Sequence, residues 1–210
     1  MKFIGITGGV GAGKSEVLTF FREHYNCRVM LADEIAHDLM EPGTACYEQL
    51  KTLFTGVDVY ETENGPFDRK KLAAVIFSDD SLLQRLNAIV HPAVHVYVTE
   101  TAEAERKKGT LDLLVLEAAL LIEENYGEIC DELWYVYASE EVRRKRLKES
   151  RGYSDEKTSG IFAAQLSEEE YRKHCSVILD NGGTFSDTIR QIREILYRYG
   201  INEQDGSEPL

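Results

Sequence analysis

The stretch Ile6-Thr7-Gly8-Gly9-Val10-Gly11-Ala12-Gly13-Lys14-Ser15 contains the pattern G-x-x-x-x-G-K-[ST], from Gly8 to Ser15. It follows an apolar run, Lys2 to Thr7, and precedes a segment of helical periodicity, Glu16 to His24. A strand, a glycine-rich loop and a helix in this order are typical of a phosphate-binding loop. Glycines let successive backbone N–H groups curl around phosphate oxygens, and the helix N-terminus adds positive potential. The alternative is a glycine-rich turn that merely joins strand to helix.

In a phosphate-binding loop the two residues at its end have separate tasks. Lys14 is expected to reach the β and γ phosphates of a nucleotide, and the Ser15 hydroxyl is expected to bind Mg²⁺. The pattern therefore predicts a nucleotide and Mg²⁺ as ligands, and by itself it does not distinguish ATP from other triphosphates. The residues predicted to hold the nucleotide here are Gly8, Gly9, Gly11, Ala12, Gly13, Lys14, Ser15 and Glu16.

Further apolar runs predict an α/β fold. Three near-continuous runs, Arg28 to Ala32, Leu111 to Glu117 and Glu132 to Ala138, are typical of strands covered on both faces, and Ser176 to Asp180 is a weaker one. They alternate with helical segments, which favours a parallel sheet flanked by helices in a single P-loop domain.

The pattern changes in the middle of the chain, where no buried-strand run occurs. Helical segments are predicted at Arg69 to Phe77 and from Asp79 to Lys108, the latter interrupted by Pro92. We expect a helical insertion. The predicted division is a core at about 1–40 and 110–200, an insertion at about 41–109 and a lid at about 143–166.

Two shorter segments carry local signals. Glu63-Asn64-Gly65-Pro66 predicts a turn within the insertion, because Asn-Gly readily adopts the positive φ angles that tight turns need. The polar segment from Asn202 to Leu210 is expected to be frayed.

Composition narrows the possible partners and location. The 210 residues include 24 basic and 37 acidic side chains, a net charge of −13, which argues against a broad grip on nucleic acid or an anionic membrane. No apolar run approaches the ~18 residues that a membrane span needs. The scattered cysteines have no metal-ligand spacing and are expected to be small buried hydrophobes in a reducing compartment, so we expect a cytoplasmic protein; they are Cys27, Cys46, Cys130 and Cys175.

The class of P-loop protein depends on residues outside the loop. A GTPase would need an Asn-Lys-x-Asp segment, and the chain has no Asn-Lys dipeptide. A small-molecule kinase instead needs a group that activates the acceptor hydroxyl. Asp33 follows the second predicted strand at its carboxyl end, where ligands gather in parallel sheets. The alternative is that Asp33 is only the N-cap of the helix predicted from Glu34 to Met40.

A kinase also needs an acidic group near Mg²⁺ and cations that neutralise the transferring phosphoryl group. Glu117 ends a buried strand and is the candidate acid; alternatively it simply faces water. The basic segment Arg143 to Tyr153 predicts a lid, in which Arg146 and Arg151 are the candidate catalytic cations. The remaining cations fit a solvated helix face that pairs with Glu140, Glu141 and Glu149.

With these elements in place, the sequence resembles the dephospho-coenzyme A kinase family almost from end to end. The P-loop alone is generic, but its combination with the other motifs in this order is much more specific. The motifs that carry the resemblance are Ile6 to Ser15, Ala32-Asp33-Glu34-Ile35-Ala36, Glu41-Pro42-Gly43, Asp68-Arg69-Lys70-Lys71-Leu72, Leu86-Asn87-Ala88-Ile89-Val90-His91-Pro92, Leu120-Leu121-Ile122-Glu123, Gln165 and Asp180-Asn181-Gly182-Gly183.

The resemblance implies a kinase that phosphorylates the ribose 3′-hydroxyl of dephospho-CoA with ATP, in the last step of CoA synthesis. It implies that Asp33 activates the acceptor and that the insertion recognises the CoA moiety through Arg69 and His91-Pro92. It also implies that Asn181 and Gly182 lie near the adenine of ATP. Alternatively, His91-Pro92 marks only a helix kink or start.

Several positions depart from the family pattern, and other functions stay open. Glu117 stands with Ala118-Ala119 where Asp-Val-Pro is common, His37 replaces a frequent Arg, and Ser150 occupies the usual lid arginine position beside Arg151. The other functions are a P-loop kinase of another nucleotide or small alcohol, and a regulatory protein that binds nucleotide without catalysis. The sequence leaves the oligomeric state open.

Overall fold

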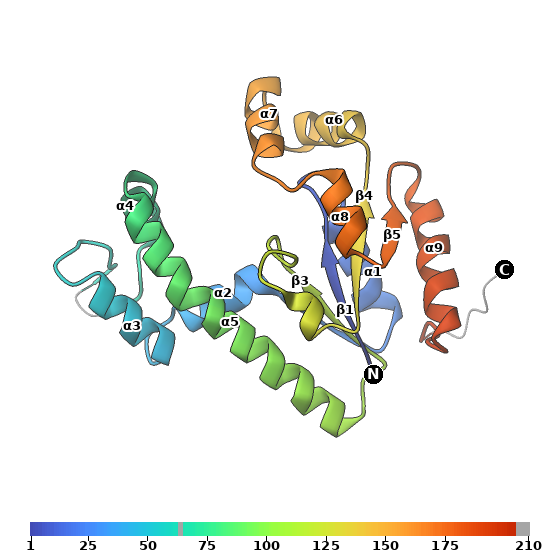
Figure 1. Cartoon of the computed structure of the whole chain (residues 1–210), viewed down its shortest axis with the longest axis horizontal. Helices are drawn as coiled ribbons and strands as arrows, with labels where there is room; N and C mark the ends of the chain where they lie inside the picture. The colour runs from blue at the N-terminus through green and yellow to red at the C-terminus, as the bar shows by residue number, and fades with distance from the viewer. Residues whose placement is uncertain (63–64, 205–210) are drawn as a thin grey trace. The chain divides into compact units, whose positions relative to one another are not determined.

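The computed structural model describes residues 1–62 and 65–204 (Figure 1). The chain divides into two compact units. Unit 1 contains Met1–Met30 and the chain from Ala104 onward, and unit 2 is Leu31–Glu103. The insertion predicted at about 41–109 stays a prediction, because its boundaries differ from those of unit 2. Each unit is described below on its own.

Unit 1 is built on a five-stranded sheet with the order β2-β3-β1-β4-β5. Parallel pairing sets Ile6 of β1 opposite both Glu117 of β3 and Trp134 of β4, and Tyr137 of β4 opposite Asp180 of β5. The predicted parallel sheet flanked by helices is confirmed, and all five predicted strands are present with ends that shift by two residues at most. The strands are β1 (Lys2–Thr7), β2 (Cys27–Leu31), β3 (Leu113–Glu117), β4 (Glu132–Tyr137) and β5 (Val177–Asp180).

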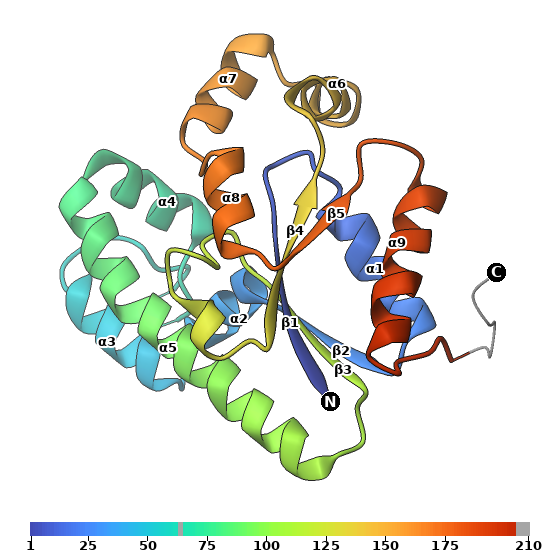
Figure 2. The same cartoon turned by 45° about the vertical axis from the view of Figure 1, so that its right-hand side comes forward.

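Neighbouring residues of β4 show how both faces of the sheet are covered. Trp134 is fully buried and contacts the ring of Phe21 in α1 (Lys14–His24), with ring centroids 6.0 Å apart. Tyr135 points to the opposite face, because side chains alternate along a strand, and stacks at 4.6 Å on Tyr171 of α8 (Glu168–His174). In Figure 2, α1 and α9 (Phe185–Arg198) lie on one side of the strands and α8 lies on the other.

The segment between β4 and β5 forms three helices that begin at serine caps. Helix α6 (Glu140–Arg151) is capped by Ser139, α7 (Asp155–Ala163) by Ser154, and α8 by Ser167. In each case the serine hydroxyl accepts a hydrogen bond from a backbone N–H in the first turn, which would otherwise lack a partner. A short 3₁₀ turn, η1 (Tyr126–Glu128), precedes β4.

Unit 2 is helical, as the sequence predicts for most of it. Helices α2 (Ala32–Leu39), α3 (Ala45–Leu53) and α4 (Arg69–Ser78) precede a long helix, α5 (Asp80–Lys108), whose last residues lie in unit 1. The expected interruption of this last helix at Pro92 is wrong, because α5 continues through it. Buried residues recur every four positions on both sides of Pro92, which keeps one face of the helix packed: Leu86, Val90, Val94, Val98 and Ala102.

Three further expectations can be compared with the structure. The predicted turn includes Glu63 and Asn64, which lie outside the described residues. The prediction of a frayed tail is wrong for residues 202–204, because Glu203 is buried and pairs with Arg193 at 2.8 Å; the rest of that tail is not described. Within residues 1–62 and 65–204, no helix is both long and apolar enough to cross a membrane.

Candidate functional site

Because the strands of unit 1 run in parallel, the segments that follow them meet at one edge of the sheet. The loop Gly8–Gly13 follows β1, Glu117 ends β3, α6 follows β4, and Asn181 follows β5. Most of the residues predicted to handle a nucleotide therefore lie at this edge, although they are far apart in the sequence.

The ammonium group of Lys14 lies inside this edge of the sheet. Lys14 Nζ donates a hydrogen bond to the Gly8 carbonyl at 2.7 Å and lies 3.6 Å from Glu117 Oε1. Both side chains are about one-fifth exposed. Since Glu117 contacts Lys14, the alternative that it simply faces water is wrong. A half-buried lysine beside a turn of backbone N–H groups is an arrangement suited to phosphate oxygens.

On the other side of the loop, Asn181 and Arg146 both bind the carbonyl of Ala12. Asn181 Nδ2 donates to Ala12 O at 2.7 Å, and Arg146 donates to Ala12 O at 3.3 Å and to the Asn181 carbonyl at 2.8 Å. The Asn181 side chain is 1% exposed, and its oxygen accepts a hydrogen bond from Thr188 of α9. These bonds connect α6, β5 and α9 to the phosphate-binding loop.

Two residues that were not predicted as site residues also contact the loop. Gln165 was named only as part of the family resemblance, and the assignment of Arg143 to a solvated helix face is wrong. Arg143 Nε donates to Val10 O at 3.0 Å, and Gln165 Oε1 accepts from Val10 N at 3.3 Å. Helical spacing could have identified Arg143, because it lies one turn before Leu147, the buried residue of α6. Gln165 follows α7 in a polar segment, and only the family resemblance draws attention to it.

The remaining predicted residues of unit 1 lie at helix ends and turns. Ser15 and Glu16 are exposed in the first turn of α1, and the Gly182 N–H donates to Asp180 Oδ1 at 2.8 Å. Arg151 is the last residue of α6, and its guanidinium lies 5.9 Å from the ring centroid of Tyr153.

The residues near Ser15 fit a magnesium ion that is bound mainly by substrate. Among the described residues there is no cluster of three or more His, Cys, Asp or Glu side chains that could hold a metal. Mg²⁺ prefers oxygen ligands and commonly keeps several waters while one or two protein oxygens and the substrate phosphates complete its shell. The Ser15 hydroxyl at the helix N-terminus is an oxygen ligand of this kind.

In unit 2, Asp33 is an exposed residue in the first turn of α2. The alternative that it is merely the N-cap of this helix is wrong, because Leu31 occupies the N-cap position and no side chain caps the helix. A carboxylate in the first turn interacts favourably with the helix dipole, yet it is not engaged in capping.

Arg69 lines a hollow of unit 2 with a volume of about 490 Å³. Its guanidinium hydrogen-bonds His37 Nε2, which in turn lies 3.5 Å from Glu41 Oε1. Asp68 caps α4, and the backbone N–H groups of Lys71 and Lys70 hold the pKa of its carboxyl below the ordinary value. The hollow is lined by His37, Glu41, Glu61, Pro66, Phe67, Asp68, Arg69 and Lys70.

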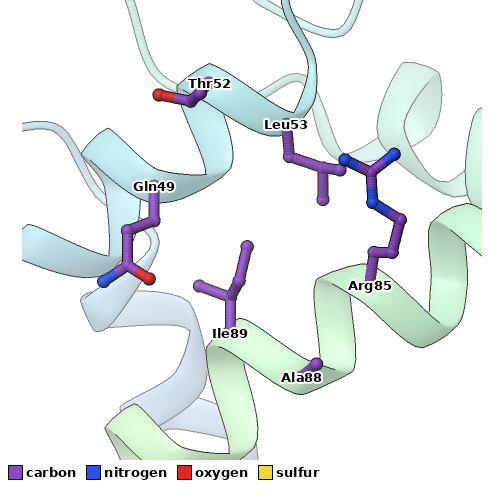
Figure 3. A pocket seen from close by; sticks show the side chains of 6 residues that line it. All are labelled: Gln49, Thr52, Leu53, Arg85, Ala88 and Ile89. Atoms are coloured by element: carbon purple, nitrogen blue, oxygen red, sulfur yellow. The ribbon is translucent and has the colours of Figure 1, made fainter.

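A second hollow of unit 2, of about 440 Å³, lies between α3 and α5 (Figure 3). Gln49, Thr52 and Leu53 line it from α3, and Arg85, Ala88 and Ile89 line it from α5. His91 and Pro92 lie further along α5 and line neither hollow. The alternative that this dipeptide starts a helix is wrong, because it lies in the interior of α5.

Comparisons with known proteins agree with this arrangement. Among solved structures, a protein from Thermus thermophilus superposes with a TM-score of 0.73 at 34% identity, covering 94% of this chain and 97% of its own. The dephospho-CoA kinase of Campylobacter jejuni, at 20% identity with coverage of 95% and 100%, gives 0.70. A shikimate kinase from Bacteroides thetaiotaomicron, at 14% identity with coverage of 93% and 98%, gives 0.54; these last two show the fold alone.

Relatives found by sequence identify the family more narrowly than the structural neighbours do. The dephospho-CoA kinase of Geobacillus kaustophilus is 35% identical over 96% of this chain and 98% of its own length. That of Carboxydothermus hydrogenoformans is 34% identical over 95% of each chain. The family model described as dephospho-CoA kinase matches residues 2–187. The chain therefore belongs to the dephospho-CoA kinase family.

Proposed function

We propose that the protein transfers the γ-phosphoryl group of ATP to the ribose 3′-hydroxyl of dephospho-CoA, giving CoA and ADP in the last step of CoA synthesis. The observation that carries this proposal is the phosphate-binding loop with Lys14 and Glu117 beside it, in a chain of this family. Transfer forms a bond from the 3′-oxygen to the γ-phosphorus and breaks the bond to the oxygen that bridges the β and γ phosphates.

The loop and α1 hold the phosphates of ATP. The backbone N–H groups from Gly8 to Gly13 and the positive end of α1 favour binding of an anion. Lys14 binds the β and γ phosphates. Ser15, together with Glu117, would hold Mg²⁺, which would supply positive charge to neutralise the phosphates. Glu16 completes the first turn, and Asn181 with Gly182 borders the adenine.

The arginines of α6 complete the nucleotide site. Arg146 contacts the loop through the Ala12 carbonyl and orders it, and together with Arg151 it offsets the charge of the phosphoryl group in transfer. Arg151 lies at the end of α6 and acts when the lid at about 143–166 closes.

Unit 2 recognises the acceptor. The Asp33 carboxylate accepts the proton of the 3′-hydroxyl or orients it toward phosphorus, which general-base catalysis requires. Arg69, in the hollow that contains His37, binds an anionic group of dephospho-CoA. His91 and Pro92 shape the same recognition from α5.

The cellular setting follows from composition. With a net charge of −13 the protein has no broad electrostatic attraction to nucleic acid or to an anionic membrane. Cys46, Cys130 and Cys175 are buried free thiols, which suits a reducing compartment. We place the protein in the cytoplasm.

The decisive experiment measures ADP formation with ATP and Mg²⁺, with and without dephospho-CoA, and the mass of the acceptor. ADP release that depends on dephospho-CoA, with one phosphoryl group added to the acceptor, is expected. If ATP binds but dephospho-CoA does not stimulate ADP release, the assigned acceptor is wrong and other hydroxyl acceptors must be screened.

The substitution Asp33→Asn tests the acceptor-activating role. It should leave ATP binding intact and lower kcat by about 10²- to 10⁴-fold, the usual contribution of a general base. Asp38→Asn, an exposed acid at the other end of α2, is the matched control and should keep parental turnover. Lys14→Ala should instead weaken ATP binding and turnover together. Parental turnover of Asp33→Asn would remove Asp33 from the mechanism.

A further inference from the structure

Arg143 lies in the first turn of α6 and covers part of the phosphate-binding loop. Its Nε donates to the Val10 carbonyl at 3.0 Å, and its Nη2 donates to Gln165 Oε1 at 2.6 Å. The same Gln165 oxygen accepts the Val10 N–H at 3.3 Å. Val10, Gln165 and Arg143 therefore form a closed ring of hydrogen bonds at the centre of the loop.

Two further contacts fix the plane of the guanidinium. The ring of Phe162 in α7 lies 4.0 Å from Arg143 Cζ, which is a cation–π contact. On the loop side, a methyl group added to Gly9 would collide with Cζ and both terminal nitrogens of Arg143. The guanidinium is thus in close contact with the backbone at Gly9.

The partners of this cation are neutral. Val10 offers a carbonyl, Gln165 an amide oxygen and Phe162 a ring. Within the part of the chain that the structure describes, Arg143 forms no ion pair with a carboxylate within 4.0 Å. Nearby Glu140 is paired with Arg144 at 2.7 Å. Burial lowers the pKa of Arg143 and raises the pKa of its neighbours Tyr135 and Tyr171, which stay uncharged at neutral pH.

A half-buried cation without an anion is costly unless a ligand supplies the opposite charge. Here it lies against a loop whose backbone is shaped for phosphate. Exchange of the Val10 carbonyl for a phosphate oxygen would replace a neutral acceptor by an anionic one, so that both partners of the hydrogen bond carry charge. The neighbouring Arg144 has no such need, because Glu140 already balances its charge.

We propose that Arg143 is a phosphate ligand of the bound nucleotide, held over the loop by Gln165 and Phe162. The inference rests on the proposed function, in which the loop binds ATP. It adds a fourth cation to Lys14, Arg146 and Arg151 and gives Gln165 the role of a positioning residue.

Equilibrium dialysis with labelled ATP and labelled adenosine, in the presence of Mg²⁺, tests the proposal. Arg143→Gln should raise the Kd for ATP at least tenfold and change the Kd for adenosine less than twofold, because adenosine has no phosphate. Arg143→Lys should fall between Arg143→Gln and the parent. Arg144→Gln, the adjacent arginine on the same helix, is the control and should bind ATP as the parent does.

A second variant keeps the test valid if Arg143→Gln folds poorly. Gln165→Glu gives Arg143 a carboxylate partner at the position where Nη2 already donates, so the bound carboxylate competes with phosphate. We expect weaker ATP binding by at least threefold with an unchanged or higher Tm. If Arg143 had only a structural role, the ATP affinity and the Tm of Gln165→Glu should instead change in the same direction.

The outcomes separate this inference from the proposed function. If the parent itself does not bind ATP, the proposed function fails. If the parent binds ATP and Arg143→Gln binds it equally well, or loses ATP and adenosine affinity to the same degree, Arg143 is not a phosphate ligand. Unchanged ATP affinity in Gln165→Glu would also contradict the proposal.

Discussion

Gly13 shows how a single residue is fixed both by backbone conformation and by its neighbour. Its φ of 93° lies in the left-handed region, which side chains other than glycine seldom adopt. A Cβ at this position would also collide with the Asn181 amide, which is buried and bound to the Ala12 carbonyl. Glycine is therefore required here for two independent reasons.

Gly13→Ala should lower the free energy of unfolding by about 2–4 kcal/mol, the sum of the left-handed strain and a disrupted buried hydrogen bond. Gly109→Ala is the matched control in unit 1: its φ is 65°, but nothing lies within 4 Å of the added Cβ, so only about 1–2 kcal/mol of strain applies. Urea unfolding followed by the fluorescence of Trp134 measures both. Equal losses of unfolding free energy in the two variants would mean that the Asn181 side chain moves aside at no cost.

Residue by residue, sequence could predict the loop but not all of its partners. The loop is a local pattern, so its backbone and Lys14 are readable from ten consecutive residues. Arg143 and Gln165 reach it from positions more than 130 residues away, and the sequence pattern assigned Arg143 to a solvated helix face. Only the fold shows that Arg144 pairs with Glu140 while Arg143 contacts Val10.

Among the elements, Glu132 at the start of β4 connects three parts of unit 1. Its carboxylate accepts hydrogen bonds from Lys2 at 2.9 Å, from Tyr199 at 2.8 Å and from Trp134 Nε1 at 3.1 Å. Burial raises the pKa of this carboxyl, but these bonds outweigh it and keep the pKa below the ordinary value. The ionised form therefore stabilises the fold. This stabilisation is complete above the unfolded pKa of about 4.3 and is lost as pH falls through the folded pKa.

Glu132→Gln should cost about 1.5–3 kcal/mol at pH 7, the range for a hydrogen bond to a charged group. Near pH 3 the difference from the parent should be smaller, because a larger fraction of the parent carboxyl is then protonated. Urea unfolding at both pH values, followed by circular dichroism, gives the two differences. The exposed acid Glu149 of α6, changed to Gln, should show little effect at either pH. A difference that stays constant with pH would contradict the role of charge.

The strands were more predictable than the helices, for a physical reason. A parallel strand buried on both faces is a continuous apolar run, and the run Lys2 to Thr7 is the same in prediction and structure. Helix α8 has seven residues with only Tyr171 buried, so no apolar period exists to detect. At Pro92 the error was of the opposite kind, because an interruption was expected where the helix continues. A proline inside a helix costs about 3 kcal/mol through the lost backbone hydrogen bond and the clash of its ring, and the buried stripe of α5 offsets this cost.

For the whole molecule, the residues proposed to bind the nucleotide and those proposed to bind the acceptor belong to different units. Lys14, Glu117, Arg146 and Asn181 belong to unit 1, whereas Asp33 and Arg69 belong to unit 2, which is inserted between Met30 and Ala104. A ligand stabilises the native form of the region that it binds, by RT ln(1 + [L]/Kd). Each substrate should therefore leave its own protection pattern on the backbone.

Hydrogen exchange read by mass spectrometry can separate these patterns. With a non-hydrolysable ATP analogue at about 100 times its Kd, openings that destroy the loop should slow by about 100-fold, protecting β1, α1 and β5. Dephospho-CoA alone should instead protect α2 and α4 of unit 2. Lys14→Ala should abolish the first pattern and keep the second, because Lys14 belongs to unit 1 and is proposed to bind the phosphates of ATP. Protection by dephospho-CoA confined to unit 1 would show that Arg69 does not bind the acceptor and that the helices of unit 2 serve another purpose.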